Sequence, residues 1–191
     1  MTDPRRAAAH RRARQALLDY TDDEPDQQRL REEFLAVLSA HDDALSRTGR
    51  PDHLTASALV LSPDADRVLL DLHRKVGRWL QFGGHVELRD PDLAGTALRE
   101  AREESGIDAL SLVSTRPVRL DRHPAPCSPG RARDHLDVQF VAVASPDARP
   151  RASAESHDVR WFPVRALPEP TDDSVRVLVA AAVTQVRQAS G

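Results

Sequence analysis

The fold of this chain is decided by Gly83-Gly84-His85-Val86-Glu87 and, after eleven further residues, by Arg99-Glu100-Ala101-Arg102-Glu103-Glu104-Ser105-Gly106-Ile107. On a helix, residues three and four positions apart are neighbours, so Glu100, Glu103 and Glu104 project from one face. Clustered carboxylates repel one another unless a cation lies among them, and oxygen ligands of this kind suit Mg²⁺ or Mn²⁺. The stretch therefore predicts a divalent metal site on an acidic helix that follows a glycine turn.

These residues resemble the Nudix box, the signature of the Nudix hydrolase superfamily. The box reads Gly, five residues, Glu, seven residues, and then Arg-Glu-apolar-x-Glu-Glu-x-Gly-apolar. Gly84 supplies its first glycine and Ala101 takes an apolar position. Asp90 stands where the box has its first Glu, and eight residues instead of seven separate it from Arg99. We expect the extra residue in the loop before the helix, so this is a variant box.

The resemblance implies roles for the conserved positions of the box. Glu103 and Glu104 are expected to hold metal, Glu100 to hold metal or act as the general base, and the Gly84 carbonyl to add a ligand. Metal ions neutralise the charge of a diphosphate and lower the pKa of a bound water, whose proton a carboxylate can take. Arg99 lies four residues before Glu103 and is expected to orient it; the alternative is a routine surface pair.

Three further acids flank this machinery. Glu87 can pair with Arg99 from the glycine turn, and Asp90 either supports the site or starts the helix. Glu155 lies six residues before Trp161, and some Nudix enzymes carry a further catalytic or metal-binding acid in a comparable loop. The alternative for Glu155 is a solvated loop residue.

Substrate-binding candidates come from two regions of the chain. In the first, His73-Arg74-Lys75 forms a basic cluster that can bind phosphates, or is simply an exposed loop. Trp79 either stacks on a base or belongs to the core, and Gln81 lies just before the glycines.

The second region is rich in histidine. His123 and His135 flank a loop rich in Pro and Arg, and Asp137 follows. Similar elements occur in a bacterial Nudix subgroup, and they predict a substrate-facing patch or a second metal site; the alternative is a structural role. His85, next to Gly84, either contacts phosphate or covers the turn.

Composition limits the other possibilities. The chain has 191 residues, 40% of them apolar but only 4% aromatic, with a formal charge of −3. This charge gives no strong nucleic-acid signal, despite the arginines near the N-terminus. No apolar run approaches the ~18 residues of a membrane span, and no secretory signal is visible, so we expect a cytoplasmic protein. Cys127 is the only cysteine, which excludes an intramolecular disulfide.

Apolar spacing and turn residues predict the remaining elements. Helices are expected at 4–19, 27–46 and 93–105, and from Thr171 as N-cap onward. Strands are expected at 55–61, 67–72, 110–120, 136–144 and 159–164, with loops at 123–134 and 145–154. This order fits an α/β layered domain. The resemblance implies the Nudix fold, a mixed β-sheet sandwiched between helices.

We expect two parts, an N-terminal helical extension over residues 1–50 and a Nudix hydrolase domain over 51–191. The helix at 27–46 has an apolar stripe that must be buried. It either packs on the Nudix core or forms a homodimer through the N-terminal helices.

The favoured function is a Mg²⁺- or Mn²⁺-dependent hydrolase that cleaves the diphosphate linkage of a small nucleotide-type substrate, a nucleoside diphosphate-X or a nucleoside triphosphate. The alternative is a catalytically inactive Nudix-like module that binds a nucleotide and regulates a partner. Such a module would be expected to lose helix carboxylates, and all three are present. Isomerase chemistry on the same fold would call on Cys127, in a Pro-rich loop, and is disfavoured.

Overall fold

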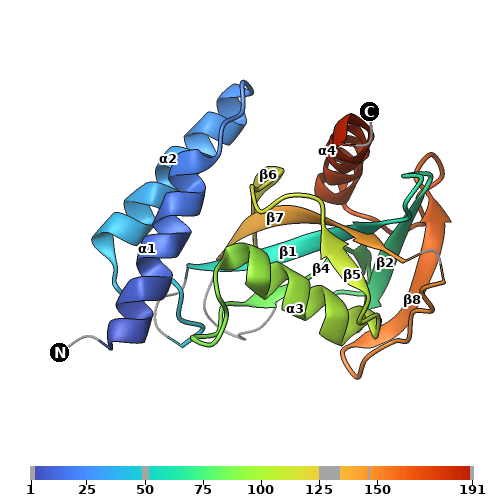
Figure 1. The fold of residues 1–191 in the computed structure, drawn as a ribbon, viewed down its shortest axis with the longest axis horizontal. Coiled ribbons are helices and arrows are strands. Elements are labelled where there is room, and N and C mark those ends of the chain that lie inside the picture. The colour runs from blue at the N-terminus through green and yellow to red at the C-terminus, as the bar shows by residue number, and fades with distance from the viewer. Residues whose placement is uncertain (1–2, 49–51, 125–133, 146, 190–191) are drawn as a thin grey trace.

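The computed structural model describes residues 3–48, 52–124, 134–145 and 147–189. In these residues, four helices surround one mixed sheet of eight strands (Figure 1). The helices are α1 (Pro4–Asp19), α2 (Pro25–Ala40), α3 (Leu93–Ser105) and α4 (Asp173–Ala189). The strands are β1 (His53–Leu61), β2 (Arg67–His73), β3 (Trp79–Leu80), β4 (Phe82–His85), β5 (Leu110–Leu112), β6 (Arg119–Pro124), β7 (Asp134–Ala144) and β8 (Ser156–Pro163).

The centre of the sheet is the parallel pair β1 and β7, in register from His53 opposite His135 to Leu61 opposite Val143. Each strand of this pair has two antiparallel partners along its outer edge. β4 and then β2 pair with β1, while β6 and then β5 pair with β7. The first halves of β1 and β7 therefore lie between β4 and β6, and this end of the sheet carries the candidate site.

Successive side chains of β1 point to opposite faces of the sheet, so alternate residues of this strand belong to two different cores. Leu54, Ala56, Ala58 and Val60 belong to the core that includes α3 and the N-terminal helices. On the other face, Leu59 and Leu61 pack in a second core with residues of α4. The sandwich of helices around a mixed sheet that the sequence predicts is confirmed.

The face that carries Leu59 and Leu61 changes character at the start of β1, where His53, Thr55 and Ser57 are buried and polar. β7 repeats the change, with Asp137 and Gln139 before the apolar Val141. Burying a polar side chain costs free energy unless the side chain forms hydrogen bonds or binds a ligand. The polar end of this face, beyond the cover of α4, is therefore the place to look for a site.

The N-terminal helices pack side by side and join the same core as α3 (Figure 1). Leu17 of α1 and Phe34 and Leu38 of α2 are almost fully buried there. Arg31 donates from Nε and Nη2 to the carbonyls of Leu17 and Leu18, at 2.7 and 2.9 Å, and so satisfies the end of α1. The sequence predicts that the apolar stripe of α2 packs either on the core or in a homodimer. In the structure it packs in the same core as α3 and β1.

Three expected element boundaries are wrong. The second helix ends at Ala40 instead of residue 46, because His41 is extended and turn-forming acidic residues follow. The expected strand 110–120 is two strands, β5 and β6. Pro117 lies in the interruption and has no N–H to donate to β7. The last helix begins at Asp173, and Thr171 donates its hydroxyl to the Pro168 carbonyl at 2.6 Å instead of capping the helix.

The predicted loop at 123–134 is shorter than expected, since His123 and Pro124 belong to β6 and Asp134 to β7. The rest of that loop, including Cys127, lies outside the described residues.

Candidate active site

Helix α3 places the three carboxylates. It begins after Asp92, whose Oδ1 accepts from the Gly95 amide at 2.7 Å, and ends at Gly106, which has a left-handed φ of 66°. Between these caps, the three glutamates differ in exposure: Glu103 has 55% of its side chain exposed and Glu100 17%, while Glu104 is partly buried. The helix thus carries a carboxylate face that runs from solvent into the protein.

Gly83 and Gly84 lie in strand β4, opposite Ser57 and Ala56 of β1, instead of forming the predicted turn. A Cβ at Gly84 would lie 2.6 Å from the Glu100 carboxyl group, and the Gly83 amide donates to Glu104 Oε2 at 3.0 Å. Glycine is needed at 84 because the Glu100 side chain of α3 lies so close to the strand, and not for an unusual backbone angle. The prediction of a glycine turn was therefore wrong, although the two glycines do lie against the carboxylates.

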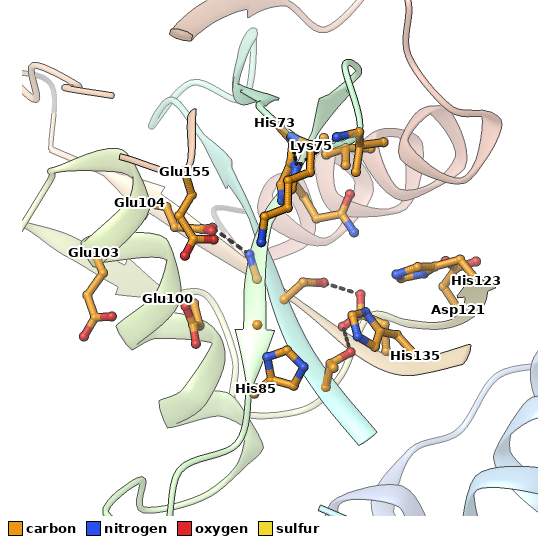
Figure 2. A pocket seen from close by; sticks show the side chains of 18 of the residues that line it. His73, Lys75, His85, Glu100, Glu103, Glu104, Asp121, His123, His135 and Glu155 are labelled. Atoms are coloured by element: carbon orange, nitrogen blue, oxygen red, sulfur yellow. Dashed lines mark hydrogen bonds and ion pairs between the residues drawn. The ribbon is translucent and has the colours of Figure 1, made fainter. Parts of the chain in front are cut away.

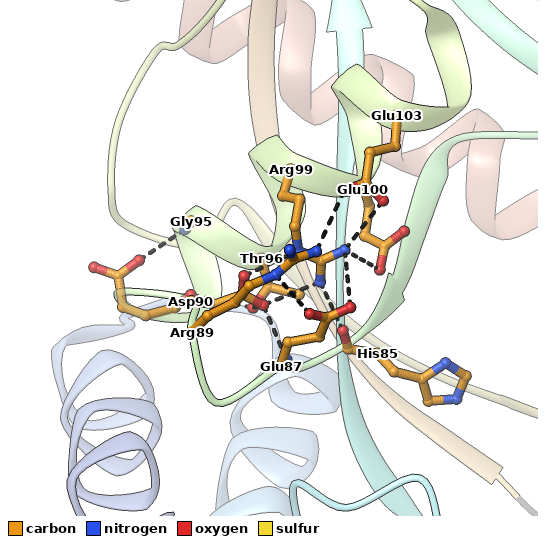
Figure 3. A network of polar contacts seen from close by, with 10 residues as sticks. His85, Glu87, Arg89, Asp90, Gly95, Thr96, Arg99, Glu100 and Glu103 are labelled. Carbon is orange, nitrogen blue, oxygen red and sulfur yellow. Dashed lines mark hydrogen bonds and ion pairs between the residues drawn. The ribbon is translucent and has the colours of Figure 1, made fainter. Parts of the chain in front are cut away.

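Arg99 is the centre of a polar network behind the carboxylates (Figure 3). Its Nη1 donates to Glu100 Oε1 at 2.8 Å, and its Nη2 to the His85 carbonyl at 2.9 Å. The contact with Glu103 is longer, 3.5 Å, and the Glu87 carboxylate lies 3.9 Å away. The sequence predicts that Arg99 orients Glu103; in the structure its shorter contact is with Glu100.

Asp90 closes this network from the loop before α3. Only 6% exposed, it accepts hydrogen bonds from both sides of Arg99, from the Glu87 amide at 2.9 Å and from the Thr96 hydroxyl at 2.8 Å. Burial alone would raise the pKa of Asp90, but these hydrogen bonds outweigh it and hold the pKa below its usual value. Of its two predicted roles, Asp90 has the supporting one, and Asp92 caps the helix.

The electrostatics of the carboxylate face suit a divalent cation. Burial raises the pKa of Glu104 to about 8, and the nearby carboxylates of Glu100, Asp71 and Glu155 add to the shift. Burial also raises the pKa of Glu100, against the opposing effect of Arg99. The negative charge of Glu104 is therefore disfavoured by burial and by the neighbouring acids. A bound Mg²⁺ or Mn²⁺ would favour the charged carboxylate.

A pocket of about 580 Å³ lies between the carboxylate face and the polar end of the sheet (Figure 2). Most of the residues that the sequence predicts for the site line it: His73, Lys75, Gln81, Gly84, His85, Glu100, Glu103, Glu104, His123, His135, Asp137 and Glu155. Figure 2 shows the glutamates on one side and His85, His123 and His135 on the other, with Lys75 reaching in from the end of β2.

Three predicted residues do not line this pocket. Arg99 lies behind the carboxylates, as described. Arg74 donates to the Ser156 carbonyl at 3.1 Å and thereby links β2 to β8. Trp79 is 7% exposed and packs edge-on against Phe162, with ring centroids 4.7 Å apart, so it belongs to the core.

Other residues at the pocket escaped the sequence argument. Arg47, Asp121, Asp172 and Ser174 line it, and the ring of His53 stacks on that of His85, which also lines it. His53 and Asp121 had a signal that was available: each sits in a strand, two residues from a polar partner on the same face. Arg47 had none, because only the packing of the N-terminal helices brings it to the sheet.

The polar end of the sheet brings together histidines from four adjacent strands. His85 (β4), His53 (β1), His135 (β7) and His123 (β6) have neighbouring rings, with centroids 5.1–5.4 Å apart. Burial lowers the pKa of His85 to about 4 and that of His135 to about 3, and the neighbouring histidines and Arg47 add to both shifts. Both imidazoles are therefore neutral at pH 7.

His123 differs from the other histidines because its Nδ1 lies 2.8 Å from Asp121 Oδ2. Burial works against its protonation, but this hydrogen bond and the neighbouring acids raise its pKa above the usual value. Asp137, fully buried beneath, accepts from the hydroxyls of Thr55 at 3.0 Å and Ser57 at 2.5 Å. The predicted grouping of His123, His135 and Asp137 thus exists in space.

A family model described as the NUDIX domain matches residues 51–181, and the chain therefore belongs to the Nudix family. Enzymes of this family generally use a divalent metal. A comparison with curated proteins found no match.

Solved structures share the fold. A Nudix-family hydrolase from Clostridium perfringens is 23% identical, with 69% of this chain and 96% of that chain covered and a TM-score of 0.56. The E. coli dihydroneopterin triphosphate pyrophosphohydrolase is 21% identical, with 71% and 96% covered and a TM-score of 0.56. A UDP-X diphosphatase is 16% identical with a TM-score of 0.52, and the match covers 93% of this chain and 90% of that one. A match of that extent takes in most of the N-terminal helices.

No helix in the described part of the chain is long and apolar enough to cross a membrane.

Proposed function

We propose that this protein is a Mg²⁺- or Mn²⁺-dependent hydrolase that cleaves the diphosphate linkage of a nucleoside diphosphate-X or a nucleoside triphosphate. The observation that carries the proposal is the position of Glu100 and Glu104 against the two glycines of β4, at the wall of the pocket. Hydrolysis would need the three glutamates of α3 and Arg99, which supports them. A module that only binds nucleotides could lose these residues, and all of them are present.

Glu103, Glu104 and Glu100, with the Gly84 carbonyl, are the groups that would hold the cation. When bound, the cation neutralises the charge of the diphosphate and lowers the pKa of water. Glu100 either holds the cation or acts as the general base, and Arg99 fixes its carboxylate for either role. The attacking water forms a bond to phosphorus as the P–O–P bond breaks, and the second phosphate leaves with the bridging oxygen.

The opposite walls of the pocket are suited to the rest of the substrate. Lys75 and His73 lie at the end of β2, where they can bind the oxygens of the phosphate that leaves. Gln81, His123, His135 and Asp137 offer hydrogen bonds to a polar group, and Glu155 is a candidate further acid facing Glu104.

The test is hydrolysis of a panel of nucleoside triphosphates and nucleoside diphosphate sugars, with Mg²⁺, with Mn²⁺ and with EDTA. Glu104→Gln should remove turnover, and Glu32→Gln, the same change at an exposed position of α2, should leave it intact. Tight nucleotide binding without turnover on any compound would overturn the proposal in favour of the inactive regulatory module.

A further inference from the structure

Three of the four histidines at the polar end of the sheet lie close enough together to hold a metal ion of their own. His53, His85 and His135 each offer a ring nitrogen, and these nitrogens all lie within 4.8 Å of one another. The residues come from the three adjacent strands β1, β4 and β7, in a part of the sheet where the register is continuous. Their backbone positions are therefore fixed by the fold and not by a loop.

Ring separations give an independent measure. In a tetrahedral zinc site with Zn–N near 2.05 Å, the centroids of two ligating imidazoles lie about 5.2 Å apart. The three centroid distances here are 5.1, 5.1 and 5.3 Å. Ligating nitrogens in such a site lie about 3.4 Å apart, so the ring nitrogens, which here lie within 4.8 Å of one another, would draw closer together around a bound ion.

The surroundings contain what a histidine site needs. Nε2 of His85 is buried and has no hydrogen-bond partner among the described residues, which is costly for a polar atom unless something else binds it. The charge nearby is mixed: Arg47 acts on His85 and His135 and opposes a cation, while Asp121 and Asp137 act on the neighbouring His123. His85 and His135 line the pocket, so a fourth coordination position would face it.

We propose that His53, His85 and His135 bind a borderline transition-metal ion, Zn²⁺ being the expected one, at a site separate from the carboxylates of α3. Imidazole nitrogen suits Zn²⁺, whereas carboxylate and carbonyl oxygens suit Mg²⁺ and Mn²⁺. The two sites therefore face each other across one pocket and select different metals. Three protein ligands with an open fourth position is the arrangement of catalytic zinc sites, where a substrate oxygen or water takes that position.

The experiment is a zinc titration of the full, metal-stripped chain with ZnCl2, in competition with a chromophoric chelator and with Mg²⁺ in excess. We expect one equivalent of Zn²⁺ to bind to the unchanged chain and to Glu104→Gln. His85→Ala and His135→Ala should weaken binding by at least about 100-fold, because even the partners that orient ligands contribute about 10–100-fold. His157→Ala, an exposed histidine on β8, is the matched control.

Co²⁺ substitution in the unchanged chain gives a second readout that needs no variant. Visible absorption typical of tetrahedral cobalt with nitrogen ligands supports the site. Absence of stoichiometric Zn²⁺ binding, an octahedral cobalt spectrum, or loss of Zn²⁺ in Glu104→Gln would each overturn the proposal. None of these readouts depends on hydrolysis, so the zinc site stands or falls apart from the proposed activity.

Discussion

Asp90 and Arg99 form a two-point ion pair across the loop that precedes α3, with Nε 2.9 Å from Oδ1 and Nη2 3.0 Å from Oδ2 (Figure 3). The remaining nitrogen of Arg99 reaches the Glu100 carboxylate at 2.8 Å. One guanidinium therefore connects a buried acid to an acid that faces the pocket. The sequence predicts the extra residue of the variant box in this loop, and in the structure Asp90 is held there against Arg99.

Arg99→Lys tests this connection. Lysine keeps the charge but not the planar fork, so it cannot hold Asp90 at two points and Glu100 as well. We expect kcat to fall by about 100-fold, because misplacement of a reacting group by about 1 Å costs that much. Arg29→Lys, at a position 66% exposed on α2, should change nothing. An unchanged kcat in Arg99→Lys would show that Glu100 needs no such support.

The pH dependence of stability follows from the lowered pKa of Asp90. The folded chain binds a proton here less readily than the unfolded chain, whose carboxyl has its ordinary pKa of 3.8. The contribution of Asp90 is therefore complete above that value and is lost as the pH falls through the folded pKa below it. Asp90→Asn should destabilise the chain by about 1–3 kcal/mol at pH 7, since the polar partners remain buried.

The measurement is urea unfolding of both chains from pH 7 down to pH 3. We expect their difference in unfolding free energy to shrink below pH 4 or so, as Asp90 becomes protonated. A difference that stays constant over this range would mean that the charge of Asp90 contributes nothing.

Gly84→Ala separates folding from chemistry. The new Cβ would lie 2.6 Å from the Glu100 carboxyl group, the far end of a flexible side chain that can move away. We expect little change in melting temperature but a loss of most Mg²⁺-dependent turnover, because Glu100 is displaced. Gly83→Ala is the comparison: its Cβ would lie 2.5 and 2.9 Å from Cβ and Cα of Ser57, which cannot yield so easily. It should cost about 1–3 kcal/mol of stability. Equal stability losses in the two variants would contradict this reading.

Much of the carboxylate face could be predicted from the sequence because it depends on local geometry. Helical spacing alone puts Glu100, Glu103 and Glu104 together, and α3 has the bounds that the sequence predicts, with Gly106 at its end. The strand that carries Gly83 and Gly84 was missed, because glycine weakens a strand and usually marks a turn. Here the tendency is outweighed by close contacts, with α3 at Gly84 and with β1 at Gly83.

The histidine side of the pocket depends on long-range pairing. His53 and His135 are opposite each other because β1 and β7 run parallel in register, and His85 joins them through β4. No local pattern sets that register. The sequence places His123 and His135 near one loop, whereas the polar pattern around His53 does not show that it lies beside them. Trp79 shows the opposite case: a residue close to the glycines in sequence that points into the core.

Gln27 makes the last prediction, because its buried side chain amide joins α2 to the sheet. It accepts from the Leu120 amide at 2.8 Å and donates to the Leu120 carbonyl at 3.0 Å, as a neighbouring strand would do. Tyr20 adds a third contact, donating to Gln27 Oε1 at 2.7 Å. Gln27→Ala should therefore destabilise the chain by about 1–3 kcal/mol for each Leu120 group left buried and unpaired.

Thermal unfolding followed by far-UV circular dichroism measures this effect. Gln15→Ala is the matched control, because the Gln15 amide donates to the exposed Asp19 on the same helix. We expect a lower midpoint for Gln27→Ala and a single transition in every case, because α1, α2 and α3 share one core with β1. A separate early transition in the unchanged chain would mean that the N-terminal helices unfold on their own, and that Gln27 links two units instead of completing one.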